Sequence, residues 1–253
     1  MSDFTRGLPL LARAARHPLP EEDEMIDALA PEMRLRIAES WLKRAEAELG
    51  AGGVFAAIAR GLFLADMPME LVWLASRAIS DEIRHGELCR YAYARYAGVE
   101  PPRASPVKTR EARGGALVLA AVHAAINESI ATVYLSASLE AADAPFANAL
   151  LRELLTDEVD HARVGWGILA DPSQQSGEAR AEVQKHLPAL IGMVRTMWRD
   201  AARSASTDLP REHGWLAGPE IAKLIDQALR DLVFPGLAHV GIDPGRAAHL
   251  LEE

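Results

Sequence analysis

Helix signals dominate the pattern of apolar and polar residues along the chain, and the strict alternation typical of strands is nearly absent. The sequence is also rich in Ala, Leu, Arg and Glu, which favour helices. It therefore predicts an all-α protein. We expect helices over residues 31–65, 69–97, 116–142, 146–169, 177–206 and 219–234, the fifth of them kinked at Pro188.

The segments between the first four predicted helices differ in length. Asp66-Met67-Pro68 and Asp143-Ala144-Pro145 are short turns. Residues 98–115 are polar, contain three prolines and form a connector long enough to cross the end of a bundle. A short turn, a long crossover and a second short turn predict a four-helix bundle with one long crossover.

Three segments are expected along the chain. Residues 1–29 are predicted to be irregular, because Pro18 and Pro20 interrupt any long helix. Residues 30–170 form the predicted bundle, and residues 171–253 form a C-terminal helical extension packed on it. The tail after Gly241 is expected to be loose.

A DExxH motif occurs twice, each time on the second helix of a predicted hairpin. The first copy spans residues 81–85 and the second spans residues 157–161. The repeat indicates two helical hairpins related by an approximate twofold axis.

Both copies of the motif place two metal-ligating residue types on one helix face. Residues three positions apart are neighbours, separated along the axis by about 4.5 Å. Glu82 with His85, and Glu158 with His161, can therefore each offer an oxygen and a nitrogen to one ion. Both pairs lie on apolar, core-facing stripes, where an uncompensated carboxylate is costly. A positive charge is therefore expected between them.

The first helix of each predicted hairpin contributes one further carboxylate. Glu128 interrupts a stripe of alanines and lies 30 residues before Glu158. The repeat therefore requires a glutamate at a similar distance before Glu82.

Three glutamates on the helix at 31–65 are candidates for that position. Glu39 and Glu46 flank Lys43 and look like part of a charged, solvated face. Glu48 shares its face with small and aromatic residues and lies 34 residues before Glu82. We therefore select Glu48.

The predicted set of four glutamates and two histidines balances the charge of two divalent ions. Oxygen and nitrogen donors without a thiolate suit Fe or Mn better than structural zinc. Glutamates on two helices with Glu-x-x-His on the other two are similar to the dinuclear pattern of ferritin-like bundles. With these residues, about residues 41–169 of the chain resemble the ferritin-like di-iron carboxylate superfamily of ferritins, rubrerythrins and di-iron oxygenases.

The resemblance implies a further shell of residues around the ligands. In that superfamily, an aspartate before the ligand glutamate bonds the histidine of the opposite helix, which would pair Asp81 with His161 and Asp157 with His85. The alternative is that both aspartates are exposed helix charges.

Two more residues match positions near the metals in the superfamily. Cys89 occupies the position of a radical tyrosine in ribonucleotide reductase small subunits and of a cysteine in bacterial multicomponent monooxygenases. Thr132 matches a threonine near bound oxygen in those monooxygenases. The alternatives are a buried cysteine packed as a small hydrophobe and a threonine bonded to its own helix.

Glycines follow Glu48 closely, although each weakens a helix by about 1 kcal/mol relative to alanine. Gly52 and Gly53 could kink the first helix or open space for a substrate beside Glu48.

Charge and composition narrow the classes of partner. A formal charge of −9 on 253 residues argues against nucleic acid or an anionic membrane surface. One cysteine excludes an internal disulfide framework. We find no clear signal peptide and no apolar stretch of the roughly 18 residues that a membrane span needs, and so expect a soluble cytoplasmic protein.

The favoured function is that of a di-iron oxidase or oxygenase, which uses O2 on a small organic substrate with two Fe ions and an external electron donor. Mn in place of Fe stays open, as does a homodimer. The alternatives are an iron- or peroxide-handling protein like ferritins and rubrerythrins, a dimanganese catalase, and a non-catalytic helical binding protein.

Overall fold

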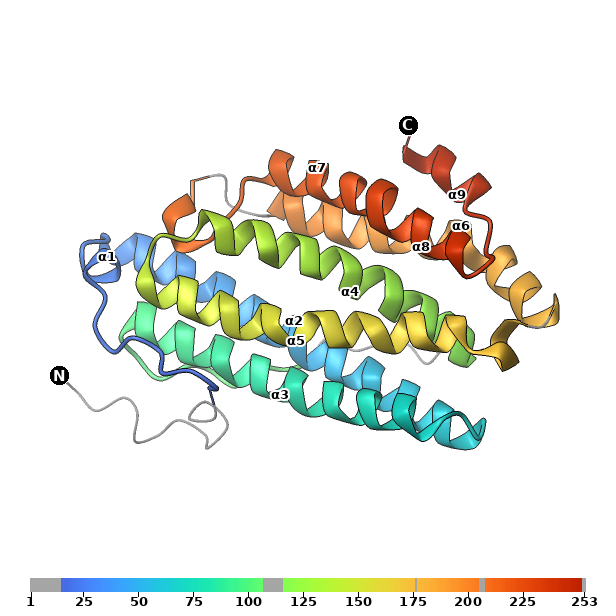
Figure 1. The fold of residues 1–253 in the computed structure, drawn as a ribbon. Helices are drawn as coiled ribbons and strands as arrows, with labels where there is room; N and C mark the ends of the chain where they lie inside the picture. Colours follow the sequence, from blue (N-terminus) through green and yellow to red (C-terminus); the bar gives the residue numbers. More distant parts are fainter. Residues whose placement is uncertain (1–14, 107–115, 176, 205–207, 252–253) are drawn as a thin grey trace.

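A computed structural model of the chain describes residues 15–106, 116–175, 177–204 and 208–251. These residues form helices packed in antiparallel pairs and contain no strand. Helix α2 (Pro31–Leu64) pairs with α3 (Met69–Ala97), and α4 (Ala116–Ala141) pairs with α5 (Pro145–Ala170) (Figure 1). The predicted all-α fold is confirmed, and the bounds of these four helices agree with the sequence prediction to within one residue.

The two hairpins pack into a four-helix bundle, with α3 against α5 and α2 against α4. Helices α3 and α4 run in the same direction, so α3 ends where α5 begins and α4 starts at the far end (Figure 1). The connection at 98–115 therefore joins opposite ends of the bundle instead of crossing one end. Of this connection, residues 107–115 lie outside the described residues.

Local chemistry explains where the helices begin and end. Pro31 and Pro145 stand in the first turns of α2 and α5, where the missing N–H costs no hydrogen bond. Gly98 ends α3 in a left-handed conformation with φ of 70°. Asp66, in the turn between α2 and α3, also has a positive φ of 50°, which aspartate tolerates better than most residues.

The C-terminal extension covers α4. Helices α6 (Gly177–Ser204) and α7 (Gly218–Ala228), with the π-helical turn η5 (Leu229–Val233), contact it, and α8 (Phe234–His239) continues from η5. The chain is thus helical to His239, beyond the predicted end at 234. The predicted end of the preceding helix at 206 lies outside the described residues.

The structure adds detail near both ends of the chain, and the expectation of a loose tail is wrong. The N-terminal segment contains a short helix, α1 (Glu24–Asp27), which is capped by the Asp23 carboxylate. The tail is not loose: α9 (Gly245–Ala248) and the turn η6 (His249–Leu251) pack on the extension, with Ala247 1% exposed. The remaining 3-10 turns are η3 (Pro172–Gln175) and η4 (Arg211–His213).

The bundle core divides into two apolar clusters along its length. Leucine, aromatic and small side chains of all four helices fill both, and α2 shows their order. One cluster contains Ile37, Trp41 and Ala45, and the other contains Phe55, Ile58 and Leu62. The predicted ligand Glu48 therefore lies between the two clusters.

By length and composition, two helices could cross a membrane, namely α2 and residues Leu117–Ala141 of α4. The expectation that no stretch is long and apolar enough is therefore wrong. The core helix of a soluble protein passes the same test, and each of these helices contributes to the bundle core. The finding is weak evidence for a membrane.

Candidate metal centre

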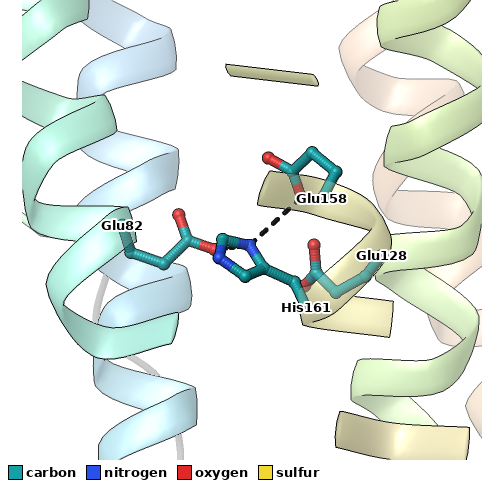
Figure 2. Close-up of side chains that lie close together, drawn as sticks. All are labelled: Glu82, Glu128, Glu158 and His161. Atoms are coloured by element: carbon teal, nitrogen blue, oxygen red, sulfur yellow. Dashed lines mark ion pairs between the residues drawn. The ribbon is translucent and has the colours of Figure 1, made fainter. Parts of the chain in front are cut away.

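Six side chains predicted from the sequence converge in the middle of the bundle, between the two apolar clusters. They form two groups whose candidate ligand atoms lie within 4.8 Å of one another and which could each hold a metal ion. One group takes its residues from α3, α4 and α5, and the other takes its residues from α2 and α3. Glu82 belongs to both groups. The groups are Glu82, Glu128, Glu158 and His161 (Figure 2), and Glu48, Glu82 and His85.

His161 of α5 lies between carboxylates from three helices, as Figure 2 shows. Its Nδ1 atom is 3.1 Å from a Glu82 oxygen and 3.3 Å from a Glu158 oxygen. His161, Glu82 and Glu158 are each at most 2% exposed. These three side chains are therefore almost inaccessible to solvent.

His85 of α3 has corresponding surroundings. Its Nδ1 atom is 3.7 Å from Glu158, 3.9 Å from Glu82 and 3.9 Å from Glu48. The two imidazole rings lie 5.7 Å apart, centroid to centroid. Each histidine thus turns Nδ1 toward the carboxylates, in agreement with the predicted approximate twofold relation.

The outer nitrogens of the two imidazoles face aspartates of the opposite helix. His85 Nε2 is 3.2 Å from Asp157, and His161 Nε2 is 3.8 Å from Asp81. Both aspartates are buried, so they are not the exposed helix charges of the alternative interpretation. A carboxylate behind an imidazole fixes its orientation and favours a free Nδ1 facing inward.

Arginines balance the aspartates on the outer side. Buried Arg84 contacts Asp157 and donates to Glu153 at 3.0 Å. Arg16 also contacts Asp157, and Arg77 lies 3.5 Å from Asp81. Burial alone would raise the pKa values of Asp81 and Asp157. Hydrogen bonds from His161 and His85, together with the charges of these histidines and of the arginines, hold both pKa values below their ordinary range.

Sequence reasoning missed Arg84 and Glu153. A signal was present in the spacing, because Arg77, Asp81 and Arg84 repeat at intervals of four and three on one face of α3. Glu153, Asp157 and Asp160 repeat at the same intervals on α5. Two such faces of complementary charge predict paired helices, provided that the neighbours in the bundle are known.

The carboxylates of the centre repel one another. Burial, together with neighbouring Glu48 and Glu158, holds the pKa of Glu82 well above its usual range. Burial and the Glu158 charge raise the pKa of Glu128 to about 8. Burial would also lower the pKa of His161, but its carboxylate partners raise it above the ordinary value. A positive charge among these carboxylates is therefore strongly favoured.

Unsatisfied polar atoms face one another at the centre, and they test whether the residues suit a metal. Within the described parts of the chain, Nδ1 of His85 and His161 and Oε2 of Glu82 and Glu158 are buried and lack a hydrogen-bond partner. Such atoms are costly unless a cation or donor satisfies them. Carboxylate oxygens and imidazole nitrogens are donors that suit iron or manganese. The residues present therefore fit a dinuclear metal site.

The three candidate glutamates of α2 differ in exposure and in position relative to the centre. Glu48 joins Glu82 and His85, and its side chain is 14% exposed. Glu39 is exposed and Glu46 is partly buried, and neither belongs to a group of the described residues that could hold a metal. Of the three, Glu48 alone belongs to a group of described residues that could hold a metal ion, and its role as a ligand stays a prediction.

Cys89 and Thr132 lie near the centre and have different surroundings. Cys89 is fully buried in the cluster that contains Trp41, and burial among the carboxylates raises the pKa of its thiol. Thr132 donates its hydroxyl to the carbonyl of Glu128 at 2.8 Å. The threonine is thus bonded to its own helix, as in the alternative interpretation.

The two glycines after Glu48 lie in different surroundings. A Cβ atom at Gly52 would lie 3.3 Å from Cβ of Glu82, so Gly52 allows α2 and α3 to approach closely. Gly53 is exposed, and α2 stays helical through both residues. Gly52 has a packing role, because a larger residue there would press against a predicted ligand.

Comparison with known proteins gives no relative. No family model, no curated protein and no solved structure matches the chain.

Proposed function

We propose that the chain binds two metal ions, most suitably iron, and acts as an O2-dependent oxidoreductase on a small organic substrate. The observation that supports this is the set of buried, unsatisfied carboxylate and imidazole atoms that face one another between two apolar clusters. Their resemblance to the ferritin-like di-iron carboxylate proteins supports the oxidoreductase class.

Six residues would hold the two ions. Glu48, Glu82 and His85 are suited to one ion, and Glu82 with the α4 and α5 ligands is suited to the other. Glu158 lies close to both histidines and would help to hold the ions. Four carboxylates would neutralise two divalent ions, so a site this deeply buried would carry little net charge.

Bound iron would supply the electron transfer that O2 chemistry needs. The chain's own residues provide orientation and exclusion of water. Asp81 and Asp157 hold the outer nitrogens of His161 and His85, which keeps both Nδ1 atoms directed inward. The two apolar clusters on either side keep bulk water away from the reacting groups.

Metal analysis of the purified protein tests the first part of the proposal. We expect two iron ions per chain after anaerobic loading, and fewer than one bound transition metal would refute it. Glu128→Ala and Glu158→Ala should each lower the stoichiometry. Glu46→Ala is the matched control, because it removes a carboxylate from α2 outside the centre and should leave the metal content unchanged.

O2 uptake tests the second part. The reduced, iron-loaded protein should consume O2 with a transient change in visible absorption, and Glu158→Ala should not. Rapid disproportionation of hydrogen peroxide by manganese-loaded protein, without O2 uptake by the iron form, would instead assign a catalase.

A further inference from the structure

One arginine near the centre contacts aromatic rings and forms no ion pair with an acid among the described residues. Arg44 lies on α2, one turn before Glu48, and is partly buried. Its guanidinium carbon is 5.5 Å from the ring centroid of Trp41 and 5.0 Å from that of Tyr134. No ion pair or hydrogen bond joins its side chain to a residue in the described ranges. A guanidinium removed from water ordinarily has an acceptor, so a partly buried arginine without a hydrogen bond is unusual.

The aromatic residues beside Arg44 also have donors without acceptors. Trp41 packs edge to face on Trp215, with ring centroids 5.3 Å apart. The indole N–H groups of both are buried and have no hydrogen-bond partner among the described residues. Trp41 itself is 1% exposed. Buried indoles usually find an acceptor. This cluster therefore has an excess of hydrogen-bond donors.

The cluster adjoins the candidate metal centre. The groups whose charges act on Arg44 are Tyr134, Glu48, Cys89 and Glu158, and two of these are predicted ligands. A molecule held by the guanidinium would thus lie beside the ligand carboxylates.

We propose that Arg44 binds the carboxylate of the organic substrate, with Trp41, Tyr134 and Trp215 holding a planar, apolar body. The proposal names the substrate class of the oxidoreductase proposed above and rests on that function. A guanidinium presents a planar fork of donors that matches a carboxylate, and its ring contacts keep that fork in one orientation. The substrate is therefore an aromatic or unsaturated carboxylic acid, and Arg44 is a binding and positioning residue.

Binding of benzoate, measured by calorimetry and by tryptophan fluorescence, tests the proposal. Wild-type protein should bind benzoate, with benzamide and inorganic phosphate at least about 10-fold weaker. Arg44→Met should weaken benzoate about 10- to 100-fold, since a charged hydrogen-bonded pair is lost. Arg44→Lys keeps the charge without the fork and should weaken it about 3- to 10-fold. Arg60→Met removes an exposed arginine of the same helix and should change nothing.

Several outcomes would overturn the proposal. They are no benzoate binding by wild-type protein, equal affinity in Arg44→Met and Arg44→Lys, and phosphate or benzamide binding as tightly as benzoate. Circular dichroism tests whether each variant is folded. If Arg44→Met does not fold, the benzoate affinity of Arg44→Lys still tests the proposal.

Metal-free and metal-loaded samples separate this proposal from the proposed function. Benzoate bound directly to metal would disappear with the metal and persist in Arg44→Met, and that result would refute the role of Arg44. Arg44-dependent binding in a protein that holds no metal would refute the oxidoreductase and keep the anion site. Two bound metals without benzoate binding would refute the anion site alone.

Discussion

Two arginines of the first hairpin lie near the candidate metal centre and have opposite surroundings. Arg84 of α3 is buried against two acids of α5, Glu153 and Asp157, which are 2% and 0% exposed. Arg44 of α2 has aromatic rings around it and no acid paired with it among the described residues. We call the first group the paired side, and Arg44 with Trp41 and Tyr134 the unpaired side.

The difference shows that one bundle can use the same residue type in two ways. On the paired side the protein supplies every partner, and the result is a fixed position for Asp157 and through it for His85. On the unpaired side the charge is held in place by rings and keeps its hydrogen-bonding capacity. The first arrangement stabilises the fold and orients a predicted ligand, whereas the second suits recognition of something outside the chain.

The largest expected loss of stability comes from moving α5, the helix that carries the acids of the paired side. A Cβ atom at Gly165 would come within 2.3 Å of the Ala125 backbone nitrogen on α4. Gly165→Ala must therefore force the helices apart, and we expect a loss of about 3 kcal/mol or more in thermal unfolding. Gly53→Ala, on the exposed face of α2, should instead stabilise the protein by about 0.5–1 kcal/mol. Equal effects of the two variants would contradict this close packing.

The next largest loss of stability is expected when the paired arginine, Arg84, is replaced. Arg84→Met leaves two buried carboxylates with fewer cations, although Arg16 and His17 still contact them. Breaking a buried ion pair typically costs about 3–5 kcal/mol, and these remaining partners reduce the expected loss to about 2–4 kcal/mol. Urea unfolding measures it. A loss below about 1 kcal/mol would mean that the paired side does not depend on Arg84.

The sequence predicts the helices and the candidate ligands better than it predicts which arginine is paired with an acid. Turn residues such as Pro68 and Gly98 act locally, so the ends of the four bundle helices follow from the sequence. The repeated DExxH motif likewise identifies the ligand helices, because its spacing alone puts Glu and His on one face. The packed tail after Gly241 and the pairing of Arg84 with Glu153 depend on which surfaces meet in space, and no local pattern fixes that.

The unpaired side shows the same limit more clearly. Arg44, at an i, i+4 spacing before Glu48, looks like half of an ordinary helix ion pair. In the structure its guanidinium stacks on rings from α2 and α4 and forms no ion pair with Glu48. Tyr134, which is far from Arg44 in the sequence, supplies one of these rings. Only the packed bundle therefore shows whether Arg44 pairs with Glu48 or stacks on rings.

A smaller effect with a defined pH dependence comes from Glu153. Burial would raise its pKa, but hydrogen bonds from His17, Arg16 and Arg84 hold it below the ordinary value of 4.5. A carboxyl group with a lowered folded-state pKa stabilises the protein above 4.5 and loses this contribution as pH falls through the folded value. Glu153→Gln should therefore cost about 1–2 kcal/mol near neutral pH. The difference from wild type should shrink as pH falls from about 6 to about 3. A pH-independent difference in urea midpoints would contradict this account of the pKa.

The smallest expected change in stability is on the unpaired side. Arg44→Met removes no ion pair, and methionine can fill the space between Trp41 and Tyr134 with favourable interactions between its sulfur and the rings. The cation–π interactions that this substitution removes are worth about 1 kcal/mol or less at a partly exposed site, so the urea midpoint should move little compared with that of Arg84→Met. Measured side by side, the two variants decide whether the arginines differ in role. If Arg44→Met destabilised the fold as much as Arg84→Met, Arg44 would be a structural residue, and its charge would need a partner within the protein. A small loss of stability together with a large loss of benzoate affinity would separate the two sides as the structure does.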